Sequence, residues 1–117
     1  PSMRHNPFMG VFALRRNRFS GPVPSDFHSG CFWLDLNGNR FSGTIPAALA
    51  DLPYTKFFDV GDNQLTGTIP DAFGARGDTL RMTQVFNAAV NHLTGTLPAN
   101  LGNISGLRRL YLNNNRL

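Results

Sequence analysis

Cysteine and long apolar runs are scarce in this chain of 117 residues. The one cysteine, Cys31, excludes an intrachain disulfide. Cys31 occupies an apolar position of its segment, so we interpret it as a core residue rather than a reactive thiol. No apolar run of about eighteen residues occurs, and the sequence therefore predicts no membrane-spanning helix in this segment.

Patterns of catalysis and metal binding are absent as well. The three histidines stand far apart, at positions 5, 28 and 92. The sequence contains no glycine-rich phosphate loop, no G-x-S-x-G elbow and no H-E-x-x-H pair. Structural zinc sites need clustered cysteines and histidines, which this chain does not supply. We expect no enzyme activity, no metal and no cofactor in this segment.

Acidic residues are few, with 7 Asp and Glu against 11 Lys and Arg and a formal net charge of +4. The basic residues are spread along the chain rather than gathered in one stripe. Aspartates are expected in the middle of the exposed sheet face, where they would repel the phosphates of a nucleic acid. We attribute the positive charge to solubility and modest steering, and we expect no nucleic-acid partner.

The dominant feature that is present is a repeated phrase. NRFSGPVP begins at Asn17, NRFSGTIP at Asn39, NQLTGTIP at Asn63 and NHLTGTLP at Asn91, and a fifth copy begins at Asn115. These asparagines are 22, 24, 28 and 24 residues apart. A period in this range is typical of a solenoid, in which each repeat forms one coil of a stack.

Apolar residues alternate just before each asparagine, which indicates a strand. The residues five and three positions before it are Phe12 and Leu14, Leu34 and Leu36, Phe58 and Val60, Phe86 and Ala88, and Leu110 and Leu112. Including the apolar positions further out, the unit reads L-x-x-L-x-L-x-x-N-x-L-[ST]-G-x-[IVL]-P-x-x-[LF]. Its last apolar position, held by Phe27, Leu49, Phe73 and Leu101, is expected to point inward from the opposite side of the coil.

This unit resembles the leucine-rich repeat. Its [ST]-G-x-[IVL]-P extension is similar to that of the plant-type subfamily, found in receptor-like kinases, receptor-like proteins and polygalacturonase-inhibiting proteins. The resemblance implies an α/β-type solenoid, a right-handed horseshoe with a parallel concave β-sheet, short second strands and a mostly irregular or 3-10 convex side. We expect a flank over residues 1–8 and an array over 9–117, with repeats starting near 9, 31, 55, 83 and 107. The last repeat is truncated, so we expect a fragment of about four and a half repeats.

The repeated polar residues have a structural explanation. Each coil turns a corner whose backbone groups are buried between neighbours, and one asparagine side chain can both accept from and donate to that backbone. We expect a structural ladder formed by Asn17, Asn39, Asn63, Asn91 and Asn115. The prolines at positions 24, 46, 70 and 98 donate no hydrogen bond, and we expect them at the ends of the second strands.

Function is expected from the exposed strand residues, because the inward ones form the core. The expected ligand-binding residues of the concave face are Trp33, Asp35, Phe57, Asp59, Asp62, Val85, Asn87, Arg109 and Tyr111. Trp33 and Phe57 are aromatic, a type enriched at interface hot spots. The other interpretation is that these two rings largely cover each other. The aspartates form an acidic centre in this prediction, with Arg15, Arg16 and Arg109 at basic edges.

Two short motifs lie outside the strands. The tripeptide from Asn103 to Ser105 is an N-glycosylation sequon on a predicted convex loop, and it also fits the ordinary repeat pattern. The third repeat is longer by four residues through an insertion at 74–82, which contains Arg76-Gly77-Asp78. That tripeptide resembles an integrin-binding motif, but an ordinary loop has the same composition.

The sequence therefore predicts a non-catalytic module that recognises a protein, a peptide or a glycan on the concave sheet. The resemblance implies part of a cell-surface receptor or a secreted inhibitor, extracellular or anchored at the membrane through segments outside this sequence. The alternative is an intracellular structural or scaffold repeat, for example an algal protein associated with cytoskeleton or cilia. The ligand, the oligomeric state and a kinase domain elsewhere in a longer protein stay open.

Overall fold

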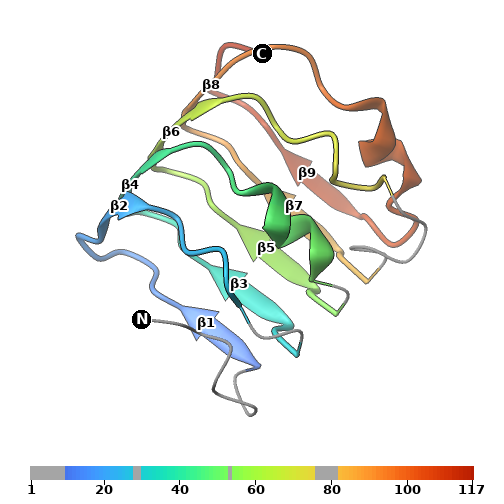
Figure 1. Cartoon of the computed structure of the whole chain (residues 1–117), viewed down its shortest axis with the longest axis horizontal. Coiled ribbons are helices and arrows are strands. Elements are labelled where there is room, and N and C mark those ends of the chain that lie inside the picture. Colours follow the sequence, from blue (N-terminus) through green and yellow to red (C-terminus); the bar gives the residue numbers. More distant parts are fainter. Residues whose placement is uncertain (1–9, 28–29, 53, 76–81) are drawn as a thin grey trace.

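The chain forms a solenoid of stacked coils, seen in a computed structural model that describes residues 10–27, 30–52, 54–75 and 82–117. The first strand of each coil joins one parallel sheet of five strands in the order β1-β3-β5-β7-β9. These strands are β1 (Val11–Ala13), β3 (Trp33–Asp35), β5 (Phe57–Asp59), β7 (Val85–Asn87) and β9 (Arg109–Tyr111). In Figure 1 they run side by side behind the return segments.

Short second strands form a second parallel sheet in the order β2-β4-β6-β8. They are β2 (Ser20–Pro22), β4 (Arg40–Gly43), β6 (Gln64–Gly67) and β8 (His92–Leu93). Figure 1 places them along one side of the stack, past the corner that follows each first strand. The two parallel sheets confirm the predicted leucine-rich repeat architecture.

The return segments contain two 3-10 helices, η1 (Ala47–Asp51) and η2 (Ala99–Asn103). Neither is long and apolar enough to cross a membrane. Pro46 and Pro98 directly precede these helices, with φ of −65° and −61°. The prediction that such prolines end the second strands was wrong, because β4 already ends at Gly43. A fixed φ and a missing N–H suit the start of a helix, where the N–H has no partner within the helix.

The core lies between the five-stranded sheet and the return segments. Phe58 and Phe86 stack with ring centroids 4.9 Å apart, and Phe73 from a return segment meets both rings edge-on at 5.6 and 5.4 Å. Phe27, Leu49 and Leu101 are buried too, as expected. The outermost coils leave apolar side chains exposed, namely Phe19, Leu110 and Leu117.

The asparagine after each first strand joins two coils. Asn63 donates from Nδ2 to the carbonyls of Leu36 in the preceding coil and Val60 in its own coil, at 3.0 and 3.1 Å. Its Oδ1 accepts the Phe41 N–H at 3.0 Å. Asn39, Asn91 and Asn115 repeat this pattern. Asn17 is exposed, and the carbonyls that it reaches are those of its own coil.

Candidate functional site

Two stacked aromatic side chains mark the five-stranded sheet. Trp33 of β3 and Phe57 of β5 lie opposite each other in the parallel register. Their ring centroids are 4.2 Å apart with an interplanar angle of 9°. Trp33 is still 39% exposed, and Phe57 is half-buried. The rings therefore cover each other only in part, and the pair presents a rigid apolar platform.

A hollow of about 380 Å³ lies at this platform. The six lining residues are Phe32, Trp33, Lys56, Phe57, Gln84 and Val85. Phe32, Lys56 and Gln84 were not among the predicted site residues, because the repeat pattern leaves their position, one residue before each strand, unspecified. Phe32 is 44% exposed, and its ring lies so close to Gly10 that an added Cβ there would clash with it. The sequence did contain one indication of this site, because Phe32 places a bulky aromatic side chain next to Trp33 at a position that the repeat pattern leaves unspecified.

The predicted acidic centre of the face was wrong in one respect. Asp35 and Asp59 lie on the sheet as expected, but they are buried, at 7% and 3% exposure. Asp59 accepts the Gly61 N–H at 2.9 Å and the side-chain amides of Asn37 and Asn87 at 3.0 and 3.2 Å. These groups cover the carboxylate and satisfy it, so that it joins coils rather than facing a ligand.

Arg15 completes this polar network instead of forming a basic edge. Its guanidinium lies 3.6 Å from the Asp35 carboxylate and 3.7 Å from that of Asp59, so one half-exposed cation neutralises part of a buried acidic pair. Gly61 is needed at the centre, because a Cβ there would lie 3.0 Å from the amide atoms of Asn37 and Asn87. The network ties together four successive coils.

Asp62 lies at the corner after β5 rather than on the strand. Its φ is +50°, and the equivalent residues Arg16, Gly38, Val90 and Asn114 also have positive φ. Asp62 is exposed. Because it lies beyond the end of β5, a ligand on the sheet could reach it only at the edge of the sheet. The remaining predicted residues line the later strands, with Val85 and Asn87 half-buried and Arg109 and Tyr111 exposed.

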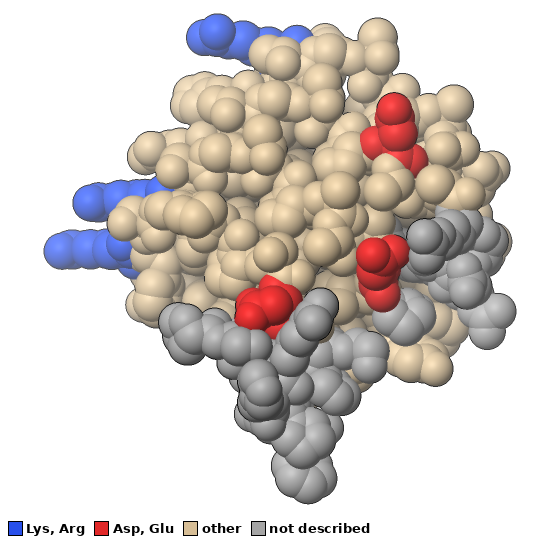
Figure 2. Space-filling view, in the orientation of Figure 1, with Lys and Arg blue, Asp and Glu red and all other residues tan. Residues whose placement is uncertain are grey.

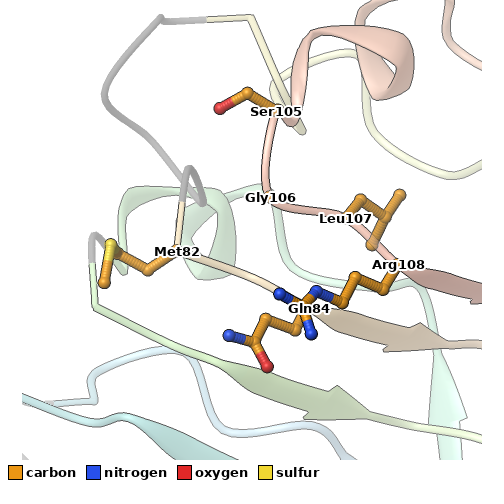
Figure 3. A pocket seen from close by; sticks show the side chains of 6 residues that line it. All are labelled: Met82, Gln84, Ser105, Gly106, Leu107 and Arg108. Atoms are coloured by element: carbon orange, nitrogen blue, oxygen red, sulfur yellow. The ribbon is translucent and has the colours of Figure 1, made fainter.

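A second hollow, of about 290 Å³, lies next to the first. Its lining residues are Met82, Gln84, Ser105, Gly106, Leu107 and Arg108. Figure 3 shows Gln84 and Arg108 reaching toward the same space from neighbouring coils, while Ser105 lies farther along the segment that leads into β9. Gln84 belongs to the lining of both hollows.

The charges on the sheet side are distributed unevenly. Among the described residues, the ion pairs are the two made by Arg15, so Lys56 and Arg108 have no acidic partner there. Figure 2 shows the molecule from the side of the return segments, with acidic side chains scattered over that face and basic ones at its margin. No three His, Cys, Asp or Glu side chains of the described part come together to hold a metal ion.

Cys31 is fully buried, and its thiol donates to the Trp33 carbonyl at 3.7 Å. Burial raises the pKa of this thiol, so less thiolate forms near neutral pH than at an exposed cysteine. Asn103, the last residue of η2, is exposed and donates to Asn100 Oδ1 at 3.3 Å. Arg76-Gly77-Asp78 lies outside the described residues.

Known proteins match both the repeats and the fold. The Leucine Rich Repeat family profile matches residues 32–52 and 54–75. Receptor like protein 24 of Arabidopsis thaliana is 38% identical over 117 residues, which cover 98% of this chain and 12% of that protein. Receptor-like protein 54 of the same plant is 35% identical over 68 residues, 56% of this chain and 9% of that protein.

Solved structures agree. The Arabidopsis receptor kinase HAESA, in complex with the peptide hormone IDA and the co-receptor SERK1, superposes with a TM-score of 0.84 at 36% identity, covering 95% of this chain and 19% of that one. The ectodomain of the Arabidopsis receptor kinase GASSHO1/SCHENGEN3, in complex with CASPARIAN STRIP INTEGRITY FACTOR 2, gives 0.82 at 36% identity, covering 88% and 12%.

Tandem repeats of this pattern on two parallel sheets define a leucine-rich repeat solenoid. The chain is built of leucine-rich repeats, and it is similar to plant receptor-like proteins and receptor-kinase ectodomains. It spans about a tenth of the length of the curated relatives that it matches.

Proposed function

We propose that this array binds an extended peptide or protein segment on its five-stranded sheet, as part of a receptor-like protein at the cell surface or outside the cell. The observation that carries the proposal is the Trp33–Phe57 platform beside its hollow. Large apolar side chains left in a concave, half-buried setting are the typical anchors of an interface.

The polar network around Asp35 and Asp59 supports binding at the aromatic platform, because its own polar groups are already occupied. Asp35 and Asp59 have their oxygens occupied by Arg15 and by amide donors within the array. Polar groups that already form hydrogen bonds or ion pairs within the array gain little from a ligand, so the binding free energy must come from other exposed residues of the sheet. The Trp33–Phe57 platform supplies exposed apolar surface there.

The relatives favour a peptide over a glycan. HAESA is solved in complex with a peptide hormone, and the GASSHO1/SCHENGEN3 ectodomain with CASPARIAN STRIP INTEGRITY FACTOR 2. A receptor-like setting outside the cell also fits the exposed sequon at Asn103. Removal of N-glycans from the protein isolated from its source should lower its apparent mass, and Asn103→Gln should abolish that shift at this site.

The test of sheet binding uses an unbiased peptide library displayed on phage, because it needs no known ligand. Peptides selected on the parent should lose about 1 to 3 kcal/mol of binding free energy with Trp33→Ala and with Phe57→Ala. Tyr54→Ala is the matched control, since Tyr54 is 60% exposed and lies outside the strands. Circular dichroism verifies that all variants fold. Equal binding by the parent, Trp33→Ala and Phe57→Ala would place recognition elsewhere.

A further inference from the structure

The residues that precede the first strands form a rigid row across the coils. This start row consists of Gly10, Phe32, Lys56, Gln84 and Arg108. Its backbone is tied at every step, since the N–H of each member donates to the carbonyl of the preceding one at 2.8 or 2.9 Å. All its side-chain-bearing members are exposed. The row therefore holds its backbone at a spacing of about 4.8 Å per coil.

The chemistry changes along this row. At Phe32 it borders the Trp33–Phe57 platform, and at Arg108 it borders the second hollow, with Gln84 shared by both hollows. Lys56 and Arg108 are cations, and the start row contains no acid. Asp35 and Asp59, the acids of the first strands, are buried and already face Arg15. One end is apolar, and the other is cationic with no ion-pair partner among the described residues.

We infer that the start row selects an acidic peptide, with an apolar side chain in the Phe32–Trp33–Phe57 hollow and a carboxylate facing Arg108. This inference rests on the proposed peptide-binding function and names the chemistry of the ligand. From the platform between the second and third coils to Arg108 in the fifth is about two and a half coil spacings, or about 12 Å. An extended chain covers that distance in three to four residues at about 3.3 Å each.

The selected motif is then an apolar residue with Asp or Glu three or four positions away on either side, since the spacing does not depend on the direction of the peptide. Lys56, on the wall of the aromatic hollow, favours a second acid near the apolar residue. Both cations are exposed, so their contribution is screened by salt and acts on selectivity more than on total affinity. Binding of the acidic peptide should therefore weaken as ionic strength rises.

Trp33 is the one tryptophan of the chain, so its fluorescence reports binding at this place directly. The probes are capped glycine-serine octapeptides with Leu and, four positions later, Glu, Lys or Ser. The parent should bind the Glu peptide about ten times more tightly than the Lys peptide. Arg108→Glu should reverse that order. Arg116→Glu, a change of an exposed arginine beyond the five-stranded sheet, should leave it unchanged.

Failure of the inference can be told from failure of the proposed function. If library peptides that depend on Trp33 lack acids, or if the Glu preference survives Arg108→Glu, the acidic selection is overturned while sheet binding stands. If no library peptide depends on Trp33, both are overturned. Circular dichroism and melting of Arg108→Glu control for misfolding, and Arg108→Gln, which should erase the preference without reversing it, provides a second, milder variant.

Discussion

Two neighbouring rows of residues on the five-stranded sheet differ in solvent exposure. The outer row begins each first strand and contains Val11, Trp33, Phe57, Val85 and Arg109. The inner row lies two residues further on and contains Ala13, Asp35, Asp59, Asn87 and Tyr111. Strand alternation puts both rows on one face. Yet the aromatic pair of the outer row stays partly exposed, while the charged pair of the inner row is buried.

The difference comes from what the next coil supplies. Asn37 and Asn87 approach Asp59 from the coils on either side, and Arg15 reaches it from two coils away. Among the described residues, Trp33 stacks on Phe57 with one side of its ring and is still 39% exposed. Alternation thus determines which side of a sheet a residue faces, but the partners in adjacent coils determine whether solvent reaches it. The inner row joins coils, whereas the aromatic pair of the outer row keeps part of its surface exposed.

The substitution Asp59→Ala tests most strongly whether the inner row joins the coils. The change leaves the Gly61 N–H and two asparagine amides without their acceptor, and we expect a loss of about 3 kcal/mol in the free energy of unfolding. Urea denaturation measures it. Asp59→Asn keeps one oxygen acceptor and should lose less. If the alanine variant is as stable as the parent, the inner row does not join the coils.

The ladder extends the comparison to the corner of the coil. Asn63→Ala removes an acceptor for Phe41 N–H and donors to two coils, and should cost about 2 kcal/mol in the free energy of unfolding. Asn17→Ala is the matched control, because that side chain is exposed and bonds to its own coil. Equal losses at the two positions would show that bridging between coils adds nothing.

The outer row should matter less for stability than for binding. Trp33→Ala removes one stacked ring from a partly exposed pair, and we expect a loss of about 1 kcal/mol in the free energy of unfolding. Thermal melting followed by circular dichroism measures this change. A loss as large as that of Asp59→Ala would mean that the outer row also builds the fold, and the division between the rows would fail.

The smallest effect is expected at Arg15. Its guanidinium is 45% exposed and lies 3.6 and 3.7 Å from its acidic partners, so solvent screens both contacts. Arg15→Ala should cost about 0.5 kcal/mol at low salt and less at high salt. Comparison of denaturation curves at the two salt concentrations tests this, with Arg40→Ala as an exposed control. A loss that does not depend on salt would indicate packing by the Arg15 stem instead.

The sequence predicted the parts of the structure that every coil repeats. The strands, the inward apolar residues such as Leu34 and Phe73, and the position of the ladder asparagines follow from the repeat phrase, because each repeat meets the same neighbours. Even Thr55 and Thr83 are buried at an apolar position, with hydroxyls that donate to the carbonyls of Cys31 and Thr55 at 2.8 and 2.6 Å.

The parts that vary between coils were harder to predict. Pro46 and Pro98 were assigned to strand ends but precede 3-10 helices, since a residue pattern does not show where a short strand stops. Asp35 and Asp59 were expected to face a ligand, because no single repeat reveals the asparagines and arginine that meet them from other coils. Phe32, Lys56 and Gln84 were not predicted, because the repeat pattern does not specify the residue before each first strand.

By itself, the sequence determined that this chain is a stack of leucine-rich repeats and which residues form its core. Those properties depend on contacts that recur identically along the stack, so one repeat predicts the next. The tertiary structure decided which side chains of the sheet face stay exposed and which are covered. That outcome depends on unlike residues from different coils, such as Arg15 with Asp59 and Trp33 with Phe57, and only the stacking of the coils brings them together.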